Sequence, residues 1–321
     1  RMAPVQCIVS CSCGKFYSCE LYLFLCEYTG SHMRYFLNKI LFLSAVALWG
    51  GFTSLSAAVV WVSILPQKYF VEAVGGEHVS VEVLVQPGQS PELYAPSAAQ
   101  LVRVAKADAY IGIGMPVEIA VLPRIVETMS KVRVLQTGTP IEGHHTLHAH
   151  DEHGACLHGD QDPHVWMDPL WVVSTVGKLQ QLLSELEPAH TADFEANAAR
   201  FIEQLNAVNL ELAGQLEPYA GRAFYINHPS LGHFAARFGL KQLSIEQAGS
   251  APSVRRIAEL VKQAKAERAG AILTQPEFGR SGATVLGRAL GVEVLEVNPL
   301  AEDYLNNLRA IADCLERSFQ K

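Results

Sequence analysis

From Val59 onward, short runs of β-branched and aromatic residues alternate with stretches of helical character. Parallel strands need a crossover connection, so this alternation is typical of βα units built on a parallel sheet. Proline at the first turn supports several of the helix starts. In the first series the predicted strands are 59–65, 78–85, 108–113 and 132–136, and the predicted helices are 66–74, 96–105 and 116–129.

A second βα series follows two helical stretches, 169–186 and 190–216. The second of these has no glycine before Gly214 and would span roughly 40 Å, enough to run along two lobes. The second series predicts strands 222–227, 240–245, 271–274 and 293–297, and helices 230–238, 252–266, 281–290 and 303–318. We therefore expect an α/β fold with an N-terminal lobe (59–189), a long rigid linking helix (190–216) and a C-terminal lobe (217–321). Each lobe has a mainly parallel sheet, and the ligand site is in the cleft between the lobes.

Residues 33–58 have the layout of a secretory signal peptide. Met33 precedes the basic residues Arg34 and Lys39, the apolar run 40–48 and a group of small residues at 54–58. The apolar run is shorter than the about 20 residues that a bilayer span needs. The pattern predicts an exported protein without stable membrane insertion. With Met33 as the start of the signal peptide, residues 1–32 are expected to be a non-native upstream segment. The alternative is a buried N-terminal helix.

Composition narrows the function classes. A chain with 49% hydrophobic and 18% charged residues is not intrinsically disordered. The formal net charge is −7 and there is no long Lys/Arg run, which disfavours a nucleic-acid partner.

The predicted loop 137–163 interrupts the βα pattern and is rich in histidine. Seven of the twelve histidines fall within residues 144–164, with carboxylates between them. Imidazoles and carboxylates bind borderline divalent metals. Ordering a loop costs entropy, so we expect weak, rapidly exchanging binding there; the alternative is a solvated acidic loop. The auxiliary metal residues would be His144, His145, His148, His150, His153 and His158.

Two other histidines stand where ordered elements end. His164 begins the run His-Val-Trp-Met-Asp-Pro after the histidine-rich loop, and His228 directly follows the predicted strand 222–227. They belong to different lobes and to the cleft-facing ends of their elements. That placement suits a metal ion held between the lobes, whereas His78, His190 and His233 are not expected to be ligands.

With these motifs, residues 59–321 resemble the substrate-binding proteins of metal-type ABC importers, most closely the zinc-binding ZnuA-like proteins. The histidine-rich insertion favours the zinc branch over the manganese branch. The motifs that carry the resemblance are Pro87-Gly88-Gln89-Ser90-Pro91-Glu92-Leu93-Tyr94, Ala107-Asp108-Ala109-Tyr110, Asp162-Pro163-His164-Val165-Trp166-Met167-Asp168-Pro169, Asn227-His228-Pro229 and Asn298-Pro299-Leu300.

The resemblance implies that His164 and His228 are zinc ligands. Glu92 stands where the family has its first histidine. Two histidines and a glutamate are a known set of zinc ligands. The alternative is that Glu92 is a solvated loop residue and binds no metal. Asn298 stands where an aspartate is often found, and Gln275 replaces a common glutamate, with Glu277 two residues on. The fourth ligand is therefore left open between Asn298, Glu277 and water.

The resemblance further implies a monomeric periplasmic protein that captures Zn²⁺ and delivers it to an ABC permease. It implies small lobe movements, tight binding without the histidine-rich loop, and no enzymatic activity. Zinc affinity should fall as histidines protonate near pH 6.5. Glu92 makes the ligand set harder, so a manganese- or iron-binding protein of the same fold is one alternative. A zinc-dependent hydrolase or a metal-binding adhesin is another. A Cys156–Cys314 disulfide is left open.

Overall fold

The computed structural model describes residues 57–118, 131–138, 162–246, 252–267 and 270–320, together with Leu122 and Glu127. Several sequence predictions lie wholly or mostly outside these residues and stay predictions. They are the upstream segment 1–32, the signal peptide 33–58 except its last two residues, most of the helix 116–129, and the histidine-rich loop with its six auxiliary histidines and Cys156. The fold below is that of the compact unit that begins at Ala57.

The first lobe is built on a four-stranded parallel sheet in the order β2-β1-β3-β4. Its strands are β1 (Ala58–Val62), β2 (Val79–Val83), β3 (Ala109–Gly112) and β4 (Arg133–Gln136), and its helices include α3 (Leu65–Gly75) and α4 (Ala98–Val104). Pro66 lies in the first turn of α3, so strand β1 ends at Val62 and Leu65 joins the helix rather than the strand. Ser97 and Gln100 form a capping box that starts α4.

The second lobe repeats the same strand order, β6-β5-β7-β8, again all parallel. Its strands are β5 (Ala223–Ile226), β6 (Lys241–Ser244), β7 (Ala271–Thr274) and β8 (Val294–Glu296), and its helices are α8 (Gly232–Arg237), α9 (Val254–Glu267), α10 (Ser281–Leu290) and α11 (Tyr304–Phe319). Alternate residues of β5 face opposite sides. Phe224 and Ile226 join the core shared with the first lobe, whereas Ala223 and Tyr225 join a smaller core on the other face of the sheet.

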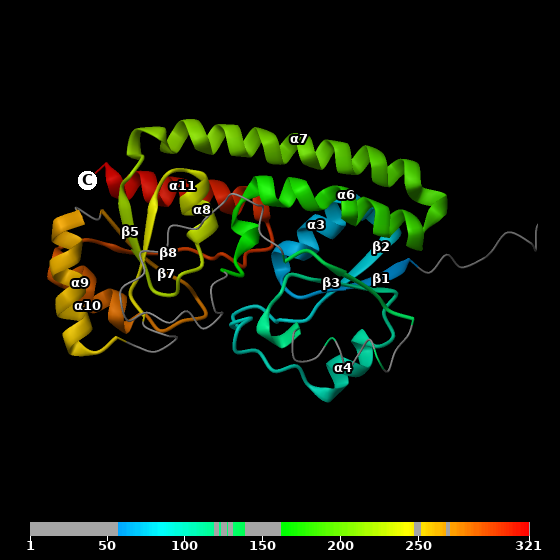
Figure 1. Cartoon of the computed structure of the whole chain (residues 1–321), viewed down its shortest axis with the longest axis horizontal. Coiled ribbons are helices and arrows are strands. Elements are labelled where there is room, and N and C mark those ends of the chain that lie inside the picture. Colours follow the sequence, from blue (N-terminus) through cyan, green and yellow to red (C-terminus); the bar gives the residue numbers. More distant parts are fainter. Residues whose placement is uncertain are drawn as a thin grey trace, which may run out of the picture. The chain divides into compact units, whose positions relative to one another are not determined.

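Helix α7 (Thr191–Leu216) joins the two lobes, as the sequence predicts. Its 26 residues span about 39 Å, and it packs against α3 and α6 (Pro169–Leu186) at one end and against α11 at the other (Figure 1). Buried residues from Phe194 to Leu216 belong to one continuous hydrophobic core that contains side chains of both lobes. Wide opening of the lobes would expose that core to water, which costs free energy in proportion to the apolar area.

Trp166 forms a second connection between the lobes. Its indole is fully buried, and its Nε1–H donates a hydrogen bond of 2.9 Å to the carbonyl of Pro299 in the second lobe. The Tyr304 hydroxyl at the start of α11 donates in return to the Trp166 carbonyl at 2.6 Å. Trp166 therefore fixes the distance between the segment that carries His164 and the second lobe.

Asp168 adds an ion pair to this junction. Its carboxylate caps α6 by accepting from the Leu170 amide at 2.9 Å. It also accepts two hydrogen bonds of 2.8 Å from the Arg237 guanidinium in α8. One carboxylate thus starts a helix of the first lobe and holds a helix of the second.

Among the residues described here, no helix combines the length and the apolar character that a membrane crossing requires.

We predict that Asp168→Asn destabilises the protein by about 2 kcal/mol, because asparagine keeps the helix cap but leaves the guanidinium of Arg237 without its charged partner. Urea unfolding of the metal-free protein measures the change. The matched control is Arg237→Gln alone and with Asp168→Asn. The losses of the two single variants should not add up in the double variant, and strict additivity would contradict the coupling.

Candidate metal centre

Glu92 lies in the loop that follows the first-lobe strand β2. Gly88 adopts a positive φ of 77° in this loop, a conformation that favours glycine. The Leu93 amide donates to the Ser90 carbonyl at 3.2 Å and closes a turn around Glu92. Leu93 is 75% exposed, whereas the Glu92 side chain is only 4% exposed. The loop therefore turns the carboxylate inward.

His164 is held by the aspartate two residues before it. The Asp162 carboxylate accepts from the His164 amide at 3.0 Å and pairs with the ring Nδ1 at 2.7 Å. The opposite ring nitrogen, Nε2, lies 3.3 Å from Glu92 Oε1. The Asp-Pro-His sequence thus fixes both the backbone and the ring direction of this histidine.

His228 follows β5 and is held by groups from two neighbouring strands. The Gln275 side chain, just after β7, accepts from the His228 amide at 3.2 Å and donates to its carbonyl at 2.5 Å. Glu246, just after β6, lies 2.5 Å from the ring Nδ1. The other nitrogen, Nε2, lies 2.7 Å from Glu92 Oε1.

The structure brings Glu92, His164 and His228 into one buried cluster between the lobes, with one ligand atom of each within 4.8 Å of the others. Zinc bond lengths of about 2.0–2.2 Å in a tetrahedral shell place neighbouring ligand atoms about 3.3 Å apart. The separation of His164 from Glu92 already has that value, and that of His228 from Glu92 would have to lengthen by about 0.6 Å.

Both imidazoles face Glu92 with Nε2 and an outer carboxylate with Nδ1. An Nδ1–H that donates to Asp162 or Glu246 leaves the Nε2 lone pair for a metal ion, an arrangement that raises the basicity of a ligand histidine. The cluster lines a cavity of about 20 Å³, which is enough for a particle the size of one water molecule. Phe278 stacks on the His228 ring at 4.4 Å and closes one side of it.

The two residues predicted as a possible fourth ligand, Asn298 and Glu277, differ in position. Asn298 uses its side-chain oxygen to accept from the Leu300 amide at 2.9 Å, and it lines an adjoining cavity rather than the one that the cluster lines. Glu277 lines both cavities, and burial raises its pKa. Gln275 is committed to the backbone of His228.

The remaining histidine near the cluster, His233, donates a hydrogen bond of 3.0 Å from its Nε2 to the carbonyl oxygen of Asp162. It contacts the outer partner of His164 and is not part of the cluster. Cys314 is buried in α11, and its pairing with Cys156 stays a prediction because Cys156 lies outside the described residues.

In the metal-free cluster, the neighbouring carboxylates determine whether the two histidines are protonated. Burial disfavours the charged imidazolium of His164, but the charge and hydrogen bond of Asp162, with those of Glu92, raise its pKa to about 9. Burial also opposes the charge on His228, yet the hydrogen bonds of Glu246 and Glu92 raise its pKa. Protons thus occupy the cluster at neutral pH and must leave when a metal binds.

Two lobes of the same parallel topology, with a histidine-carboxylate cluster between them, define a two-lobed α/β protein with a candidate metal centre. The chain belongs to the family of the zinc-uptake complex component A, periplasmic, whose model matches residues 60–318. That family is defined by a transport role rather than by an enzymatic one.

Individual relatives agree with this assignment. The zinc-binding lipoprotein AdcA of Streptococcus pneumoniae serotype 4 is 30% identical over 248 residues, which are 73% of this chain and 48% of AdcA. The chain therefore spans about half the length of that relative. The high-affinity zinc uptake system protein ZnuA of Yersinia pestis is 24% identical over 313 residues, 88% of this chain and 97% of ZnuA. A crystal structure of ZnuA superposes with a TM-score of 0.73 at 30% identity and covers 82% of this chain and 99% of that one. The predicted fold class is confirmed.

We predict opposite pH dependences for metal-free stability and for zinc affinity. Because the folded pKa of His164 is raised, its stabilisation is fully present below about pH 6.5 and is lost as the pH rises to about 9, an effect of up to roughly 3 kcal/mol. Zinc needs the neutral imidazole, so its affinity rises over the same interval. Urea unfolding and competitive zinc titration from pH 6 to 9.5 measure both. His164→Gln should flatten the stability slope, and metal-free stability that increases from pH 6.5 to 9 would contradict the prediction.

Proposed function

We propose that this chain captures Zn²⁺ in the periplasm and delivers it to an ABC-type zinc importer. The observation that carries the proposal is the buried cluster of Glu92, His164 and His228, whose ligand atoms lie within 4.8 Å of one another at the boundary of the two lobes. Membership of the zinc-uptake family supports the transport role. A zinc-bound AdcA structure of Streptococcus pneumoniae, 25% identical with a TM-score of 0.65, shares the fold.

In this proposal each ligand has a defined part. His164 Nε2 and His228 Nε2 bind the ion. The Glu92 carboxylate exchanges its contacts with the two imidazoles for a bond to the metal, and its negative charge offsets one positive charge of the ion. Asp162 and Glu246 accept the Nδ1–H of each histidine and hold the rings toward the ion. The partner is the importer's membrane permease, the protein acts as a monomer, and the signal peptide 33–58 provides export.

Manganese is the second candidate cargo, and the carboxylate of Glu92 is what favours it. A harder oxygen ligand suits manganese, whereas two imidazoles suit zinc. Competition between the two metals on the same protein tests this alternative. Most sites of nitrogen and oxygen ligands bind zinc more tightly than manganese, so a preference for manganese at equal concentrations would mark a site built for manganese.

We predict one tightly bound zinc per chain, with affinity at least about 100-fold lower in Glu92→Gln, because the ion loses the charged ligand that lies between both histidines. Competitive titration with zinc and manganese, with metal analysis, measures both. Deletion of residues 144–158 should leave the tight site intact. The control Glu82→Gln removes an exposed carboxylate paired with Arg103 and should change nothing. Preference for manganese, or loss of all tight zinc on loop deletion, would overturn the zinc assignment.

We further predict that Glu277, or a water molecule beside it, completes the zinc shell. Glu277 lines the same cavity as Glu92, His164 and His228, whereas Asn298 does not. Asn298→Ala should change zinc affinity less than about threefold, whereas Glu277→Gln should lower it about tenfold, an effect typical of a peripheral metal contact. Zinc titrations of the two variants provide the test. A larger loss in Asn298→Ala than in Glu277→Gln would assign the fourth position to the asparagine.

A further inference from the structure

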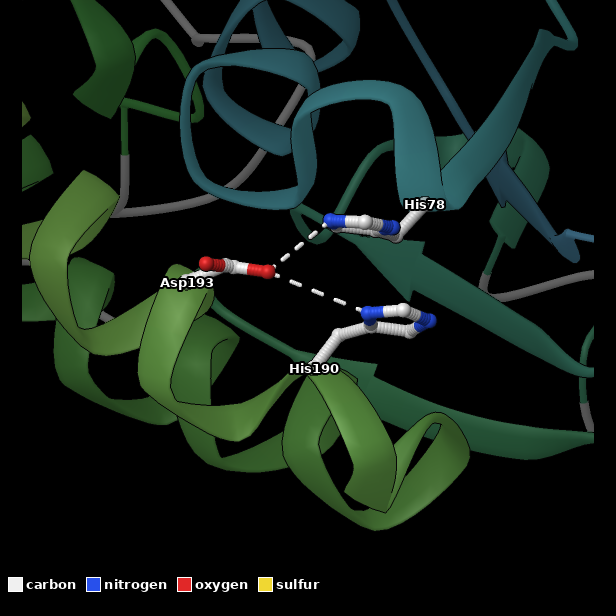
Figure 2. Close-up of side chains that lie close together, drawn as sticks. All are labelled: His78, His190 and Asp193. Carbon is white, nitrogen blue, oxygen red and sulfur yellow. Dashed lines mark hydrogen bonds and ion pairs between the residues drawn. The ribbon is translucent and has the colours of Figure 1, made fainter. Parts of the chain in front are cut away.

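A second group of metal-binding side chains lies near the start of α7, apart from the cluster that Glu92 completes (Figure 2). His78 ends the 3₁₀-helix η1 (Gly76–His78) before β2. His190 ends η3 (Pro188–His190), and Asp193 lies in the first turn of α7. One ligand atom of each residue lies within 4.8 Å of the others. The sequence alone gave no reason to expect these residues together, because His78 is more than 100 positions away from the other two.

The distances suit a shared ion. Asp193 Oδ2 lies 3.1 Å from His78 Nε2 and 3.8 Å from His190 Nδ1. These values lie on either side of the about 3.3 Å that separates neighbouring ligands in a tetrahedral zinc shell. Figure 2 shows the carboxylate beside the same edge of both rings, so the three ligand atoms lie close together.

The rings must turn to bind an ion together. They are stacked with centroids 3.7 Å apart and planes at 13°, whereas a metal ion lies in the plane of each imidazole that binds it. Both side chains are 21% exposed and the Asp193 side chain is 62% exposed, so solvent-accessible space adjoins all three. His190 Nε2 is buried and has no hydrogen-bond partner among the described residues, so rotation of this ring breaks no hydrogen bond at that atom.

A groove of about 640 Å³ opens beside the cluster and includes His78 and Asp193 in its lining. Glu72 and Glu77 add two carboxylates to that lining, against one guanidinium from Arg200. An excess of negative charge in a groove raises the local concentration of cations. The groove also gives water access to complete a shell of three protein ligands.

We propose that His78, His190 and Asp193 form a second binding site for a zinc-class divalent ion, independent of the proposed cargo site. Two imidazoles and one carboxylate suit zinc, copper or nickel better than calcium or magnesium, which prefer all-oxygen shells. The bound ion would join the beginning of β2 to the beginning of α7. Since it binds the folded chain, it stabilises the fold according to its concentration.

The test uses the full chain with the cargo site and the histidine-rich loop disabled, that is, with His164→Gln, His228→Gln and glutamine at the six loop histidines. We expect equilibrium dialysis against ZnCl₂ to show one remaining zinc per chain, and zinc to raise the melting temperature. Adding His78→Gln and His190→Gln should abolish both the bound zinc and the rise in melting temperature. No bound zinc in the starting variant up to about 100 μM, or an equivalent that survives the two added substitutions, would overturn the site.

Two controls separate ligand loss from misfolding. Glu77→Gln changes a groove carboxylate that is not in the cluster, and it should retain the bound zinc with less than a tenfold loss of affinity. Asp193→Asn should weaken zinc at least tenfold while the metal-free melting temperature stays within a few degrees of the starting variant. Equal effects of Glu77→Gln and Asp193→Asn would show general charge attraction instead of ligation and would refute the proposal. Because the cargo site is absent throughout, these results do not depend on the proposed function.

Discussion

The geometry of the metal centre depends on the buried junction around Trp166, where the two lobes are fixed to each other. The ligand atoms come from both lobes, so a change in lobe spacing would change the distances between them. Hydrogen bonds of Trp166 with Pro299 and Tyr304 cross the junction, and the Asp168–Arg237 pair crosses it close by. The shared core along α7 resists opening over a longer distance. The cluster is therefore preorganised, which lowers the entropic cost of binding an ion.

The hydrophobic pattern of the sequence predicted the presence of the helices and strands well, and the residues at which they begin and end less well. Helices 169–186 and 281–290 and strand 271–274 have the predicted bounds, because proline, a polar cap or glycine marks their ends. Strand 59–65 was predicted too long, since its apolar run continues without a break into α3 and periodicity cannot separate the two. The identical strand order of the two sheets could not be predicted, because pairing between strands depends on contacts far apart in sequence.

That Glu92, His164 and His228 come together could be predicted from the sequence, whereas most of the groups that hold them could not. His164 and His228 stand at element ends in recognisable motifs, and Glu92 follows from its motif position. Glu246 reaches His228 only because β5 and β6 are neighbours, although carboxyl ends of parallel strands do gather at one edge. The role of Gln275 is clear only in the structure, where its amide both donates to and accepts from the backbone of His228. A glutamate there could not donate to the carbonyl.

The same preorganisation limits how a bound ion could leave. An ion in the cavity contacts both lobes, so at least one ligand must be displaced for its release. His164 belongs to the packed junction and the His228 backbone is held by Gln275. Glu92 is the residue of the cluster whose loop is mostly exposed, with Leu93 beside it 75% exposed. Since the shared core opposes wide opening of the lobes, movement of this loop exposes the ion at a smaller cost in buried apolar area than separation of the sheets.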